Sequence, residues 1–283
     1  MTYSLALALA AALLDVTIGY PARLARAIGT PAGWIAAWLA AVRGASAGWP
    51  GGAALAVYLA PVAVAAAVVA QALPSDPIGF AVTALLSSAF CGRQSLDRRA
   101  RAAIAVWEGE GPGAALAALE ALGAEESEIR LAPAGAAAIA ARFADEAAAP
   151  TVFILVGGLV GAVLCQALAL AGRACREGHD GSKFARGVAV LEAWTLAPAA
   201  RLGAFWIAAA SGRASALRAL AVRAATPTAP AQGAMRAALG EAARDEPAYL
   251  RRALALFRRA GAAEILTLAA LALASAALFS PPM

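Results

Sequence analysis

The feature that most constrains this chain is a set of apolar runs as long as a lipid bilayer is thick. A helix needs about 20 apolar residues to cross the hydrocarbon core of a membrane, with a range of about 17–25. The runs 53–73, 151–171 and 262–280 reach this length. The sequence therefore predicts an all-α, polytopic integral membrane protein.

Three further apolar runs are shorter or interrupted. The runs 3–18 and 78–92 fall below the length of a full span, and 193–210 carries Pro198 and Arg201. Together with the three long runs, they lead us to expect about five to six membrane helices.

Composition agrees with a membrane protein and restricts its partners. The chain is 62% hydrophobic and 14% charged, whereas soluble domains are about 45–50% apolar and about 25% charged. An alanine-rich soluble helical protein stays open on composition alone, because alanine raises hydropathy without making a span. The net charge is +5, and no basic run is interleaved with aromatic residues, so we expect no nucleic-acid partner. The three cysteines show no metal-ligand spacing, and no metal site is expected.

Prolines and glycines divide the chain between these runs. The sequence "PSDP" at 74–77 predicts a tight turn that joins the runs on either side into a helical hairpin. The turn 111–113 divides a polar insert, 93–149, into two expected amphipathic helices. A second polar region, 211–260, contains a Thr/Pro/Ala-rich loop and two expected helices. We expect both regions to belong to a single membrane domain, 1–283, and to lie in the cytoplasm.

The distribution of basic residues predicts a topology. If all six runs cross the membrane, the loops 19–52, 93–150 and 211–261 share one side and hold 18 of the 23 basic residues. The positive-inside rule makes that side cytoplasmic and places both termini outside. The loop 172–192, with four basic residues, then lies on the opposite side. If the fourth and fifth runs are re-entrant, this loop faces the cytoplasm as well. The expected location is the cell (inner) membrane.

The opening segment "LLDVTIGYPARLARAIGTPAGWI" combines an acidic residue with Gly-Tyr-Pro and Gly-Thr-Pro turns after an apolar run. It resembles the start of the CobD/CbiB family of integral-membrane cobalamin-biosynthesis proteins. Later segments resemble the same family in the same order along nearly the whole chain. These segments are "RQSLDRRARAAIAVWEGEGPGAALAALEAL", "AAIAARFADEAAAPTVFILVGGLVGAVLCQAL", "KFARGVAVLEAWTLAPAARLGA", "QGAMRAALG" and "YLRRALALFRRAGAAEILTLAALAL".

The resemblance implies an activity. Family members form the amide bond between adenosylcobyric acid and aminopropanol or its phosphate, which gives adenosylcobinamide or its phosphate. If this chain is active, it is an ATP-dependent acid–amine ligase with a corrinoid substrate, and ATP and Mg²⁺ are its cofactors. Such chemistry needs carboxylates for the metal, basic groups for phosphate, and a base for the ammonium nucleophile.

The chain departs from the family at several polar motifs. Thr30 replaces the histidine of a Gly-His-Pro-Val segment. The family's Asn-Thr-x-Asp-Ser-Met-x-Gly signature aligns onto residues 168–175, "LALAGRAC", and none of its polar side chains is present. Polar candidates remain elsewhere. The candidate catalytic residues are Glu192, Arg201, Asp145 and Glu146, and the candidate cofactor-binding residues are Asp15 and Met235.

Each candidate also has a structural reading. Arg201 could snorkel or form a structural pair, Asp145 and Glu146 could cap the helix that follows, and Asp15 could end a helix at the membrane interface. A catalytically degenerate paralogue is therefore the alternative function. It would act as a membrane scaffold or sensing protein, similar to AmpE-type proteins, with a membrane-protein partner or as a homo-oligomer. A transporter is less favoured, because no inverted repeat is evident.

Overall fold

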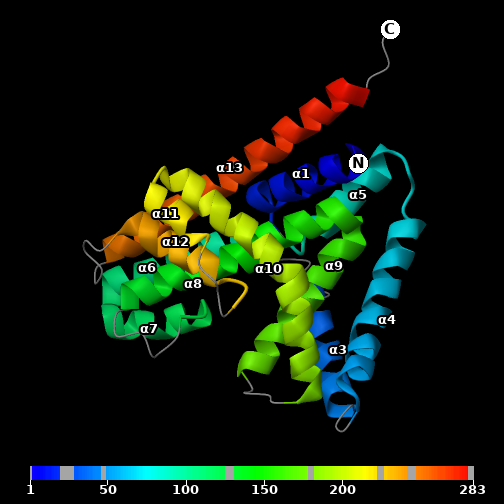
Figure 1. Ribbon diagram of the computed structural model, residues 1–283, viewed down its shortest axis with the longest axis horizontal. Helices are drawn as coiled ribbons and strands as arrows, with labels where there is room; N and C mark the ends of the chain where they lie inside the picture. Colours follow the sequence, from blue (N-terminus) through cyan, green and yellow to red (C-terminus); the bar gives the residue numbers. More distant parts are fainter. Residues whose placement is uncertain are drawn as a thin grey trace. The chain divides into compact units, whose positions relative to one another are not determined.

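The computed structural model describes residues 2–19, 29–45, 49–124, 131–177, 182–221, 226–240 and 247–279. Within these residues the chain is helical and contains no strand (Figure 1). The all-α class expected from the sequence is therefore confirmed. The helices divide into two compact units. Unit 1 comprises Met1–Cys91, Ala149–Leu196 and Leu268–Met283, and unit 2 comprises Gly92–Ala148 and Ala197–Thr267.

Helix α9 is the centre of unit 1. It runs over Ala149–Glu177 and packs against α1 (Thr2–Thr17), α3 (Pro31–Ala45), α4 (Gly51–Ala72) and α5 (Pro77–Ser88). At Gly158 the backbone leaves helical geometry, with φ of 58°, so α9 is kinked there. Glycine adopts this positive φ without a steric penalty. Because α9 changes direction at Gly158, the parts before and after the kink can pack against different neighbouring helices.

Helix α3 was not anticipated, because the segment 19–52 was expected to be a loop. Its buried residues Ile35, Leu39 and Val42 recur at intervals of three to four, which forms one apolar stripe against α9. Trp34 and Trp38 lie on the exposed side. With 15 residues, α3 is about 22 Å long and too short to cross a bilayer.

The structure also brings together two segments that the six-span topology separates. Arg43, near the end of α3, donates a hydrogen bond from Nη1 to the carbonyl oxygen of Ala174, at 3.3 Å. At the start of α4, a Cβ atom at Gly51 would overlap the backbone of Lys183, the first residue of α10 (Lys183–Ser211). The ends of α3 and α9 and the starts of α4 and α10 therefore lie at one end of unit 1, on the same side of any membrane that unit 1 spans.

Unit 2 is built around α8, Leu131–Phe143, whose residues are mostly alanine and are buried on all sides. Its neighbours are α6 (Arg93–Glu110), α7 (Pro112–Ala121) and α12 (Ala229–Leu239). The unit also contains the short helix α11 (Ala214–Ala219), the second part of α10, and most of α13 (Pro247–Phe279). Helices α6 and α7 meet at Gly111, whose φ is 89°, so the turn expected at 111–113 is confirmed.

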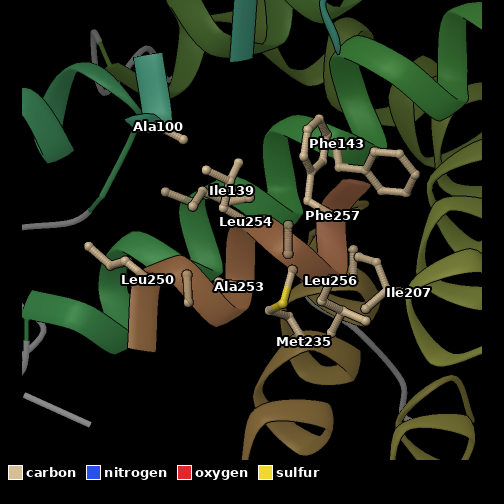
Figure 2. Close-up of a cluster of buried hydrophobic side chains, with 14 of the residues drawn as sticks. Ala100, Ile139, Phe143, Ile207, Met235, Leu250, Ala253, Leu254, Leu256 and Phe257 are labelled. Carbon is tan, nitrogen blue, oxygen red and sulfur yellow. The ribbon is translucent and has the colours of Figure 1, made fainter. Parts of the chain in front are cut away.

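Small residues let the helices of unit 2 approach closely. A Cβ atom at Gly135 would lie 2.8 Å from side chains of both Leu119 and Leu250. The aromatic rings of Phe143 and Phe257 meet edge to face at 5.5 Å between centroids. Figure 2 shows this buried cluster, in which side chains from several helices converge. Burial on all sides explains why α8 shows no single apolar stripe in its sequence.

Four helical segments are long and apolar enough to cross a membrane. They are Gly51–Ala72, the continuous segment Leu131–Arg176, Lys183–Ser211 and Pro247–Leu278. Helix α1 is apolar but has 16 residues, and α5 has 12. The expected hairpin turn at 74–77 is present, but α5 packs chiefly on α1 and α9, while α4 packs on α9 and α3.

Gly79 provides a test of the turn before α5. Its N–H donates to the Asp76 carboxylate at 2.8 Å, and a Cβ atom there would overlap the carbonyl oxygen of Pro74. We expect Gly79→Ala to lower the unfolding free energy by about 2 kcal/mol, because backbone must shift to relieve the overlap. Thermal unfolding in detergent measures the effect.

The control is Gly44→Ala on the exposed side of α3, where an added Cβ meets no atom within 4 Å. Alanine should stabilise that helix by about 0.5–1 kcal/mol. Equal unfolding midpoints for the two variants would show that the turn geometry is wrong.

Candidate functional site

Two of the candidate catalytic acids, Asp145 and Glu146, lie on a π-helical turn. The turn covers Ala144–Ala148, and it follows α8 directly. Single π-helical turns within α-helices are rare and frequently occur at functional sites. Both acidic side chains are partly buried. The irregular backbone therefore coincides with the acidic pair that the sequence singled out.

Glu146 is held by two arginines from different helices. Arg99 of α6 donates from Nη2 to Oε2 at 2.6 Å, and Arg142 of α8 donates from Nη1 to Oε1 at 2.8 Å. The Glu146 side chain is 12% exposed, that of Arg142 17% and that of Arg99 38%. Each carboxylate oxygen thus receives a charge-assisted hydrogen bond, and the cluster opens to its surroundings on the Arg99 side.

The backbone around this cluster is also fixed. The N–H of Gly92 donates to the carbonyl oxygen of Glu146 at 2.6 Å, and a Cβ atom at Gly92 would lie 3.0 Å from that of Glu146. Arg142 Nε donates to the carbonyl oxygen of Leu122 at 3.1 Å. Glycine at position 92 therefore lets the start of α6 reach the π-helical turn. We call Arg99, Arg142, Asp145 and Glu146 the acid–arginine cluster.

A second ion pair of unit 2 is almost completely buried. Arg93 Nη2 lies 2.7 Å from Glu264 Oε2, and the two side chains are 3% and 4% exposed. The Arg93 side chain passes beside Gly261 of α13, where a Cβ atom would lie 4.0 Å from its Cδ and Nε. Charges in an apolar helix are costly unless they are paired, so Glu264 depends on Arg93.

Further ion pairs join α6 to α13, and the order of the pairs shows that the two helices run antiparallel. Arg258 Nε donates to Asp97 Oδ1 at 2.7 Å, and Asp97 also pairs with Arg101. Arg251 Nε lies 3.3 Å from Glu108 Oε1. Residue numbers rise along α6 as they fall along α13, so these pairs run from a buried end at Arg93 to an exposed end at Glu108.

Glu192 lies in unit 1 and pairs with Arg176. Arg176 Nη1 donates to its Oε2 at 2.7 Å, and the carboxylate side chain is 6% exposed. A Cβ atom at Gly172 would overlap this carboxylate, so the glycine on α9 makes room for it. The pair therefore connects α9 to the first part of α10.

The remaining candidates are dispersed. Arg201 is exposed on the part of α10 that belongs to unit 2. Met235 is fully buried on α12, and Figure 2 shows its side chain pointing into the apolar cluster. Asp15 is buried on α1 in unit 1. Of the candidates in unit 2, Asp145 and Glu146 lie together on the π-helical turn. Met235 occupies the position of a packing residue.

The segment aligned with the family's polar signature is apolar and buried. Leu168, Ala169 and Ala171 are each less than 5% exposed. One residue earlier, the carbonyl oxygen of Ala167 accepts a hydrogen bond from the buried Tyr58 hydroxyl at 2.8 Å. This stretch of α9 thus serves helix packing.

In the part of the chain that the structure describes, no group of three or more His, Cys, Asp or Glu side chains could hold a metal ion. His179, the single histidine of the sequence, and the adjacent Asp180 lie outside the described residues.

The arginines that hold the acids, and the pair formed by Arg93 and Glu264, were not identified from the sequence. One signal was present, because Arg142 precedes Glu146 by four residues, the spacing of neighbours on a helix. Arg99, Arg93 and Glu264 carried no such signal, since their partners are distant in the chain.

Comparison with models of protein families, with curated proteins and with solved structures finds no match for this chain. We therefore assign the class of protein from its fold. Four long apolar helical segments indicate a helical membrane protein, with charged side chains paired inside it.

The acid–arginine cluster can be tested by removing one charge. We expect Glu146→Gln to lower the unfolding free energy by about 2–3 kcal/mol, because two partly buried arginines lose their common carboxylate. Chemical or thermal unfolding of the purified protein in detergent measures this loss.

Glu108→Gln is the matched control. Glu108 pairs with Arg251, but the two side chains are 38% and 61% exposed, so its loss should cost at most about 1 kcal/mol. If both variants unfold alike, Glu146 is not held as the structure indicates.

Proposed function

We propose that this protein is a CobD/CbiB-like membrane protein that joins adenosylcobyric acid to aminopropanol or its phosphate through an amide bond. The observation that carries the proposal is the acid–arginine cluster on the π-helical turn. It combines the two side-chain types that amide formation needs, since arginines bind carboxylate and phosphate groups and a carboxylate can accept a proton.

Arg99 is the residue best suited to meet an anionic substrate group. Its side chain is 38% exposed, and its hydrogen bonds to Ser95 and Glu146 use Nε and Nη2. Its Nη1 makes no hydrogen bond with the residues that the structure describes. A substrate carboxylate or phosphate at Nη1 would face a guanidinium that Glu146 already orients.

Asp145 is the proposed base. It neighbours Glu146 on the π-helical turn, and it is partly exposed. The aminopropanol nitrogen must lose a proton before it attacks a carbonyl carbon, and Asp145 would accept that proton. Glu146 acts here as a positioning residue for the two arginines.

ATP and Mg²⁺ are part of the same proposal, because a carboxylate must be activated before it forms an amide. ATP supplies that activation when bound. Magnesium is commonly held by one or two carboxylates together with substrate phosphates. Arg99 and Arg142 could hold the phosphate oxygens, and because Asp145 is the proposed base, a magnesium ion would be held chiefly by those phosphates.

We further propose that the protein is a multi-pass protein of the cell (inner) membrane. The four long apolar helical segments support crossing of the bilayer. The polar helices of unit 2 carry most of the basic residues, which supports a cytoplasmic position for them. A corrinoid substrate made in the cytoplasm would then reach the cluster directly.

One observation favours a second function, that of a catalytically degenerate scaffold or sensing protein. Glu192 is bound to Arg176, and the segment that aligns with the family's polar signature is apolar and buried. An arginine in place of a metal ion neutralises the acid but activates no substrate. Such a protein would act through a membrane-protein partner or as a homo-oligomer.

Complementation separates the two functions. A bacterial strain that lacks its adenosylcobinamide-phosphate synthase is grown without cobinamide, with this chain supplied on a plasmid. We expect growth that depends on the chain, and Asp145→Asn should slow cobinamide formation by about 100-fold or more, as expected for a lost general base.

Asp76→Asn is the control, because asparagine caps a helix about as well as aspartate. It should leave growth unchanged, and both variants should accumulate in the membrane at equal levels. Absence of growth with the well-expressed wild-type chain would contradict the synthase and favour the scaffold.

A further inference from the structure

One face of α10 in unit 1 carries two cations followed by two large apolar side chains. Lys183, Arg186, Val190 and Trp194 are spaced by three, four and four residues, so they lie along one side of the helix. All four are exposed, Val190 to 60% and Trp194 to 79%. We call these four residues the α10 stripe.

The cations of the α10 stripe are available to a ligand. Neither Lys183 nor Arg186 forms an ion pair with any residue that the structure describes, in contrast to Arg176, which binds Glu192. Both lie in the first turn of α10, where the backbone N–H groups and the helix dipole add positive potential.

The surroundings strengthen this positive end. The close approach of Gly51 to Lys183 places the start of α4 beside the start of α10, and Arg43 bonds to the end of α9. Two helix N-termini and basic residues from three helices thus meet at one end of unit 1. Glu192, nine residues after Lys183 on α10, is paired with Arg176.

The dimensions of the α10 stripe match one leaflet of a bilayer. Lys183 and Trp194 are eleven residues apart, which corresponds to about 16 Å along a helix. Half of a hydrocarbon core is about 15 Å thick. A phospholipid seated on the stripe would have its headgroup at the cations and its acyl chains along Val190 and Trp194.

We propose that the α10 stripe binds an anionic phospholipid, with Lys183 and Arg186 holding the headgroup phosphate. Anionic lipids are concentrated in the cytoplasmic leaflet and attract basic segments beside membrane helices. Because the polar helices of unit 2 are also proposed to be cytoplasmic, the starts of α4 and α10 share that side if the fourth and fifth apolar runs are re-entrant. The lipid proposal is independent of the proposed synthase activity.

The test uses the full chain purified in detergent and compares Lys183→Gln/Arg186→Gln with the wild type. Binding of phosphatidylglycerol, phosphatidylcholine and inorganic phosphate is measured by native mass spectrometry and by the shift in unfolding temperature. We expect the wild type to bind phosphatidylglycerol and the double variant to bind it roughly 30-fold more weakly, from about 1 kcal/mol for each basic residue near a membrane surface. Phosphatidylcholine and inorganic phosphate should give no comparable binding.

Arg218→Gln/Arg259→Gln is the control, because it removes two exposed cations from unit 2 instead. It should bind phosphatidylglycerol within about twofold of the wild type, and Lys183→Arg/Arg186→Lys should retain binding. If Lys183→Gln/Arg186→Gln and Arg218→Gln/Arg259→Gln lose phosphatidylglycerol binding equally, the proposal is overturned, because net charge alone would then explain the binding. Equal binding of phosphatidylcholine, full binding of inorganic phosphate, or unchanged binding by Lys183→Gln/Arg186→Gln would overturn it as well.

Discussion

The pairing of buried carboxylates with arginines from other helices is the constraint on which this structure depends. Glu264 lies within one of the long apolar helices and Glu192 within another, where an isolated charge would be very costly. Arg93 and Arg176 remove that cost, and each reaches its acid from a different helix. The pairs therefore allow apolar helices to carry charge, and they specify which helices become neighbours.

Small residues make these pairings possible. Gly172 leaves space for the Glu192 carboxylate, and Gly92 leaves space for the π-helical turn. The apolar cluster of unit 2 is also built on small residues, since α8 is mostly alanine and is buried on all sides. In such a chain, alanine and glycine allow close backbone packing, and the few large side chains fill the space that remains.

The sequence predicted the parts of the fold that depend on local pattern. The three long apolar runs predicted α4, most of α9 and the second half of α13, and the glycines at 111–113 predicted the turn between α6 and α7. Helices α3 and α8 were missed because they show neither a long apolar run nor a charged face.

The candidate site was predictable only in part. Asp145 and Glu146 could be named from the sequence, but Arg99, which lies 47 residues before Glu146, could not. The π-helical turn also leaves no local pattern, since its residues are alanines and two acids that an α-helix would accept equally well. Long-range ion pairs depend on which helices pack together, and that is a property of the whole fold.

The most direct test of this account exchanges the two charges of the most buried pair. Arg93→Glu and Glu264→Arg are each expected to lower the unfolding temperature strongly, because like charges would then face each other at 3–4% exposure. The account predicts that the double exchange, Arg93→Glu/Glu264→Arg, recovers most of the loss, with a coupling free energy of at least about 2 kcal/mol. Additive losses in the double variant would contradict it.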